Sequence, residues 1–189
     1  MIARSGACGK EGLGCIHGCR TTTGRPRRVA TPHSLPAADM KNLFEADTVE
    51  EVRARIARLA PTSARQWGRM SAAQAVAHCV VGLEIALGDQ RPPRVLIGRL
   101  LGPIIKRLAL KDEAPMRRNS PTVPNMVVTD ERELDAERRR LLQLLDRFAA
   151  AGPAGCTTHP HSFFGRLTPE EWAVLQYKHL DHHLRQFAV

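Results

Sequence analysis

Apolar residues recur with the spacing of an α-helix along most of the chain after residue 40, and Pro or Gly interrupts the pattern at intervals. Patterns typical of strands are nearly absent, and there are no internal repeats. The chain is therefore predicted to be all-α, with an irregular loop over residues 111–128. Five helical segments are expected: Thr48 to just before Pro61, Ser71 to about Leu87, about Arg94 to Leu110, Asp130 to just before Gly152, and a last helix opened by Thr168.

Four of these segments begin with residues typical of a capping box, in which two side chains three positions apart bind the free backbone N–H groups of the first turn. Pro169 also follows Thr168 at the first helical position, where its fixed φ suits the helix. The last helix therefore has the clearest start in the sequence. The expected pairs are Thr48 with Glu51, Ser71 with Gln74, Asp130 with Glu133, and Thr168 with Glu171.

The segment from Arg94 to Leu110 is apolar but contains three basic residues, Arg99, Lys106 and Arg107. No stretch of the chain therefore reaches the roughly 18 uncharged apolar residues of a membrane-spanning helix. A basic amphipathic helix could lie on a membrane surface. We expect instead that this helix is buried in a bundle with its Lys and Arg groups in solvent, and that the protein has no membrane partner.

Charge is distributed unevenly along the 189 residues, which carry a net charge of +9. Residues 1–39 contain six basic and two acidic residues and show no helical or strand period. We expect a disordered basic tail over 1–39 and a bundle domain over 40–189, with Met40 as an alternative native start. Only 4% of the residues are aromatic, so few side chains could stack on bases, and nucleic-acid binding is the less favoured interpretation.

The five cysteines are an odd number, which argues against a disulfide framework. Cys8, Cys15 and Cys19 lie near His17, but no partner pair follows at zinc-finger spacing, so we interpret these cysteines as incidental. The N-terminus has no apolar core of a secretory signal. We therefore expect a cytoplasmic protein with reduced thiols.

Two histidines lie on the apolar face of the last helix. At about 100° per residue, His179 and His183 fall within about 20° of Trp172, and their spacing of four residues brings both rings within reach of one ion. A pair of buried imidazoles needs hydrogen-bond partners or a shared metal. His182 turns toward the rim of this face, and Asp181 is expected at the surface.

His78 lies on the inward stripe of the helix that begins at Ser71, and Gly82 one turn later allows another helix to approach closely. Three histidines from two helices form an open metal site with a position left for water or substrate. The Glu of a His-Glu-x-x-His zinc-protease motif is missing, because Leu180 follows His179. Cys79 points about 100° away from His78 and is not expected as a fourth ligand.

The C-terminal string from His161 to Trp172, followed by Tyr177-Lys-His-Leu-Asp-His-His-Leu-Arg-Gln-Phe187, resembles the DinB-like (YfiT-like) superfamily, in an uncharacterised branch that ends in this motif. The helix around Met70–Cys79 matches the one that donates the first histidine. The resemblance covers about residues 40–189. It implies a four-helix bundle with an additional short helix or irregular segment, and one divalent metal held by His78, His179 and His183. Some superfamily members are transferases or isomerases that use low-molecular-weight thiols such as mycothiol or bacillithiol.

Three functional hypotheses follow. The first is a metal-dependent enzyme, a thiol-dependent transferase or isomerase or a hydrolase, acting on a small molecule such as a thiol. Zn or Ni is the favoured ion, and His182 or Glu84 is the candidate general base. The second is a non-catalytic metal-binding or stress-associated bundle. The third is a basic nucleic-acid-binding module. A homodimer is compatible with each of them.

Overall fold

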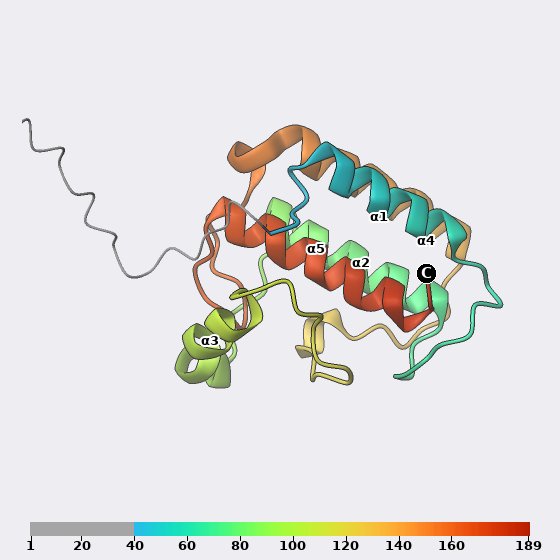
Figure 1. Cartoon of the computed structure of the whole chain (residues 1–189). Coiled ribbons are helices and arrows are strands. Elements are labelled where there is room, and N and C mark those ends of the chain that lie inside the picture. The colour runs from blue at the N-terminus through green and yellow to red at the C-terminus, as the bar shows by residue number, and fades with distance from the viewer. Residues whose placement is uncertain (1–39) are drawn as a thin grey trace, which may run out of the picture. The chain divides into compact units, whose positions relative to one another are not determined.

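The computed structural model describes residues 40–189, so the predicted disorder of residues 1–39 and their cysteines lie outside the described residues. Within 40–189 the fold is all-helical, as predicted, and an isolated bridge between His161 and Gly165 is its one β feature. The elements are α1 (Ala46–Arg58), α2 (Ala72–Leu87), α3 (Leu96–Ala109), the 3-10 helix η1 (Pro124–Met126), α4 (Leu134–Ala151), the 3-10 helix η2 (Gly152–Gly155) and α5 (Pro169–Gln186), shown in Figure 1.

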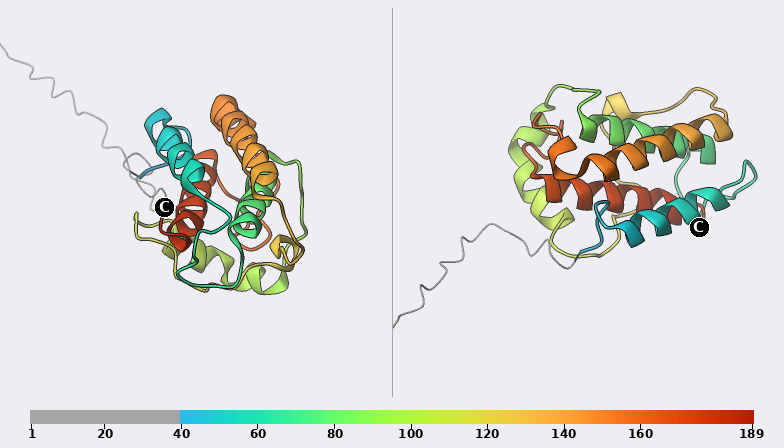
Figure 2. Two further views of the ribbon diagram at one scale, coloured as in Figure 1. Left: turned by 90° about the vertical axis from the view of Figure 1, so that its right-hand side faces the viewer. Right: turned by 90° about the horizontal axis from the view of Figure 1, so that it is seen from above.

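Four of the helices, α1, α4, α2 and α5, pack around a common core in that order, so that each contacts two neighbours. The end-on view in Figure 2 shows these four helices grouped together. Trp172, Phe148 and Leu83 are among the large side chains buried in the core. The amphipathic stripes thus close into a four-helix bundle because each helix hides its apolar side against two others.

The predicted helix starts are confirmed at two of the four positions. Ser71 with Gln74 caps α2, and Thr168 with Glu171 caps α5 with Pro169 in the first turn. The other two predictions were wrong. Helix α1 begins at Ala46, ahead of Thr48, which is buried in its first turn, and α4 begins after Glu133, whose own carboxylate accepts a hydrogen bond from the Ala136 N–H.

The predicted burial of the third helix is wrong. In Figure 1, α3 lies beside the four-helix group, and its Leu and Ile side chains are exposed. It is attached by its glycines: a Cβ at Gly98 would lie 2.6 Å from the Phe163 carbonyl oxygen, and one at Gly102 would overlap the same atom. The side of α3 that carries Gly98 and Gly102 faces the loop around Phe163, and a residue larger than glycine would not fit there. Within residues 40–189, none of the helices combines the length and apolar character needed to cross a bilayer.

The predicted surface position of Asp181 is also wrong. Its carboxylate is buried between α5 and α1, where Arg55 Nη1 lies 2.8 Å from one oxygen and Arg185 Nε lies 2.7 Å from the other. Arg55 also donates to the backbone oxygen of Val189. A buried carboxylate needs such partners, and here they join α1 to the C-terminal end of the chain.

Candidate metal centre

Helices α2 and α5 bring three imidazole rings together inside the bundle. His78 comes from α2, and His179 and His183 come from successive turns of α5. One ligand nitrogen from each ring lies within 4.8 Å of the other two, and His78 Nε2 is 2.8 Å from His179 Nε2. The ring centroids are 4.7 to 5.0 Å apart, and the planes are nearly perpendicular to one another. The three side chains therefore point their edges at one small volume.

The backbone fixes the tautomer of His78. Its Nδ1 lies 2.7 Å from the carbonyl oxygen of Met126 in η1. A carbonyl oxygen only accepts, so Nδ1 carries the hydrogen, and in the neutral ring Nε2 presents its lone pair to the cluster. A ligand histidine is commonly oriented in this way, because the bond made by its other nitrogen sets the direction of the lone pair.

A side chain from the same helix orients His183. Its Nδ1 donates to Gln186 Oε1 at 2.9 Å, which leaves Nε2 for the cluster. The side-chain amide nitrogen of Gln186 in turn donates to the backbone carbonyl of Trp67 at 2.8 Å. The backbone N–H of Gln66 donates to the backbone carbonyl of Gln186 at 2.7 Å. Gln186 thus ties His183 to the segment between α1 and α2.

The predicted role of Gly82 is confirmed for His179. A Cβ at position 82 would lie 2.9 Å from His179 Nδ1 and 3.1 Å from Gln176 Oε1, so only glycine leaves the ring its place. Gln176 is buried, and its Oε1 has no hydrogen-bond partner within residues 40–189. The cluster therefore lies beside a buried oxygen that could accept a hydrogen bond from a polar ligand.

Burial keeps these imidazoles neutral. It lowers the pKa of His78, lowers that of His183 to about 3, and lowers that of His179 well below its usual value, and the neighbouring rings lower the pKa of His179 further. Neutral imidazole is the form that binds transition metals. In tetrahedral zinc sites, bonds of about 2.0–2.1 Å place the ligand nitrogens about 3.3 Å apart. The ligand nitrogens found here are separated by distances from 2.8 Å up to 4.8 Å, which include that value, so the three rings fit such an ion.

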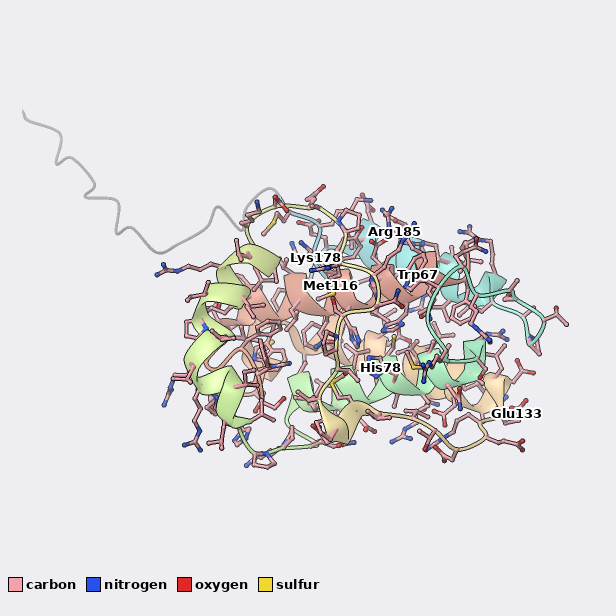
Figure 3. The ribbon with its side chains drawn as sticks, turned by 90° about the horizontal axis from the view of Figure 1, so that it is seen from below. Trp67, His78, Met116, Glu133, Lys178 and Arg185 are labelled. Carbon is pink, nitrogen blue, oxygen red and sulfur yellow. The ribbon has the colours of Figure 1, made fainter. Side chains whose placement is uncertain are left out.

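A hollow of about 420 Å³ lies near the cluster, although none of the three clustered histidines lines it. His182 lines it, and the His182 ring is 5.0 Å from that of His183 and 5.6 Å from that of Trp67. Arg118 lies 4.3 Å over the Trp67 ring, and Arg185 also lines the hollow. Figure 3 labels Trp67, His78, Met116 and Arg185 in this part of the molecule. The structure thus places His182 between the histidine cluster and an opening large enough for a small molecule.

Comparison with protein families identifies one relationship. A family model described as "Protein of unknown function (DUF1569)" matches residues 38–189. The chain belongs to this family. Searches of curated proteins and of solved structures each returned no match. The DUF1569 match spans both helices that carry the cluster.

In this DUF1569 chain, two other groups considered in the sequence analysis, Glu84 and Cys79, lie outside the cluster. Glu84 is buried on another side of α2, where its carboxylate pairs with Arg140 of α4 and accepts a hydrogen bond from Gln90 at 2.7 Å. It is not among the grouped ligand atoms. Cys79 is buried, its pKa is raised by burial, and it does not join the three histidines either. His182 is thus the one predicted base that the structure brings next to the site.

Sequence reasoning missed the groups that orient the cluster. Gln186 stands three residues after His183, so its helical spacing could have revealed it. The Met126 carbonyl and Trp67 come from irregular segments far away in the chain, and no local pattern indicates where their backbone will lie.

Gly82→Ala is expected to weaken metal binding about 10- to 100-fold, because the added methyl group displaces the His179 ring. The chain should remain folded, since alanine favours the helix by up to about 1 kcal/mol while overpacking costs about 1–3 kcal/mol. Isothermal titration of Zn²⁺ into both proteins measures the change. Gly152→Ala is a poor control, because φ is positive at Gly152 and alanine would be strained there. Ala77→Gly in α2, the helix of Gly82, is the control for an exchange of alanine and glycine in this helix. Equal affinity of the Gly82→Ala and parent proteins would contradict the assignment.

Proposed function

We propose that this protein binds one divalent transition-metal ion through His78, His179 and His183 and uses it as a metal-dependent enzyme on a small molecule. The observation that carries the proposal is the convergence of three neutral imidazoles within 4.8 Å, with Nδ1–H of His78 and of His183 each already bonded to an oxygen. The hydrogen bond of 2.8 Å between His179 Nε2 and His78 Nε2 satisfies one of these lone pairs, whereas a cation would be bound by all three nitrogens.

The ligand set favours catalysis over a purely structural role. Within residues 40–189 the group contains three histidines and no fourth protein ligand, which is typical of catalytic sites. A divalent ion held there would act as a Lewis acid and lower the pKa of a water or thiol. Zn or Ni suits three imidazoles. Membership of the DinB-like superfamily and a low-molecular-weight thiol as co-substrate belong to the same proposal.

The chain's own residues around the hollow would bind and orient the substrate. Trp67 lines the hollow, and the guanidinium group of Arg118 over its ring favours a substrate with a carboxylate or another anionic group. Burial lowers the pKa of His182, so its ring is neutral at pH 7 and able to accept a proton at the boundary between the hollow and the cluster.

Spectroscopy of the cobalt-substituted protein tests this proposal. Elemental analysis of the purified chain is expected to give one divalent ion per molecule. Addition of a thiol to the Co²⁺ form is expected to produce a thiolate charge-transfer band, because an open coordination position admits the sulfur. A chain without bound metal would contradict metal binding itself. An unchanged spectrum at millimolar thiol would instead assign the ion a structural role, as in the non-catalytic hypothesis.

A further inference from the structure

Helix α3 carries its large apolar side chains on the outside of the molecule. Leu100 is 79% exposed, Leu96 77% and Ile104 60%. At about 100° per residue, the exposed Leu and Ile residues of α3 cover about half of the helix circumference. The complete set is Leu96, Ile97, Leu100, Leu101, Ile104, Ile105 and Leu108, and we call it the α3 face.

The rest of the fold holds this helix so that the α3 face stays outside. The side turned inward is formed by Gly98 and Gly102, which pack against the Phe163 backbone. At its end, Lys178 donates to the carbonyls of Ala109 and Asp112 at 2.7 Å each. A helix that supports a core places Leu and Ile inward; here the order is reversed, with glycine inside. A continuous exposed apolar surface along a helix is typical of an interaction site.

Charge around the α3 face identifies the kind of partner. Residues 91–111 contain six basic residues and no acidic one: Arg91, Arg94, Arg99, Lys106, Arg107 and Lys111. Lys106 pairs with Glu171 and Arg94 donates to the Gly98 carbonyl, while Arg99 is exposed. Lys111 also pairs with Asp112. A partner that complements both features of this segment is apolar and carries negative charge.

We propose that α3 docks the protein on the surface of an anionic phospholipid bilayer, with the α3 face at the boundary of headgroups and acyl chains. This proposal replaces the sequence-based expectation of no membrane partner, which rested on the burial of this helix. At 1.5 Å per residue, a helix of 14 residues is about 21 Å long, which suits a helix lying in the plane of the interface and is too short to cross it. A second copy of this chain would oppose the same basic segment with its own. Residues 1–39 also carry an excess of basic residues, so they do not complement the face in charge.

Vesicle sedimentation with the full-length chain tests the proposal. The parent is expected to sediment with phosphatidylcholine vesicles that contain one third phosphatidylglycerol, to bind pure phosphatidylcholine far less, and to be released by high salt. The double variant Leu100→Glu/Ile104→Glu should lower the partition coefficient about tenfold or more, because it puts two carboxylates into the apolar side. Both residues are exposed, so the fold is expected to remain intact, which circular dichroism checks.

Val127→Glu is the matched control, since Val127 is a 53% exposed apolar residue outside α3, and it should bind vesicles like the parent. Three outcomes would overturn the proposal. The first is that the parent does not sediment with the anionic vesicles at all. The second is that binding persists in the double variant, which would assign it to the basic residues 1–39. The third is a dimer in light scattering that the double variant dissociates, with no vesicle binding, which would assign the α3 face to a second copy. Because the variants leave the histidines unchanged, their metal content reports on the proposed metal centre separately.

Discussion

Replacing His183 with alanine is expected to abolish stoichiometric binding of Zn²⁺ or Ni²⁺. The substitution removes one of three converging nitrogens and the one that Gln186 orients. Loss of a group that merely orients a ligand typically costs 10- to 100-fold in metal affinity, so loss of the ligand itself should exceed about 100-fold. Isothermal titration calorimetry of the metal-free proteins measures both affinities.

His159→Ala is the control for this experiment. His159 bonds to the Pro92 carbonyl and lies outside the grouped ligands, so its loss should leave the affinity unchanged. Thermal unfolding adds a second readout. A metal at 100 times its dissociation constant stabilises the folded parent by about 2.7 kcal/mol, and the His183→Ala protein should show no such gain. Equal affinities of the His183→Ala protein and the parent would refute the metal centre.

Replacing Asp181 with alanine is expected to destabilise the folded chain by about 3 kcal/mol. The substitution leaves the largely buried Arg55 guanidinium without its carboxylate partner, and removing one member of a buried pair typically costs 3–5 kcal/mol. Glu51, 3.5 Å from Arg55, and the Val189 backbone oxygen stay in place, so the lower part of that range is expected. Urea denaturation of the metal-free proteins measures the free energy of unfolding.

Asp135→Ala provides the comparison, because Asp135 also pairs with an arginine, Arg138, but is largely exposed. Exposed pairs contribute at most about 1 kcal/mol, so this variant should unfold close to the parent. If Asp181→Ala cost no more than Asp135→Ala, the buried network between α1 and the C-terminal end of α5 would have no stabilising role.

Several features that depend on neighbours in sequence were predictable, although two of the four expected capping boxes do not form. The capping boxes at Ser71 and Thr168 form because both partners lie within one helical turn. His179 and His183 share a face for the same reason, and Gly82 follows His78 by one turn. Helical periodicity was therefore sufficient for the all-α fold and for placing each histidine on an inward face of its helix. The three rings meet because α2 also packs against α5.

Features that depend on which surfaces meet were decided by tertiary structure alone. The wheel position of Asp181 predicted solvent, but α1 packs there and supplies Arg55. The apolar composition of α3 predicted burial, but its glycines are the side that fits the Phe163 loop. The Met126 carbonyl that orients His78 comes from 48 positions along the chain. A sequence determines the period and chemistry of each helix through short-range contacts, whereas the side that another segment covers depends on packing between residues far apart in the chain, for which no local pattern exists.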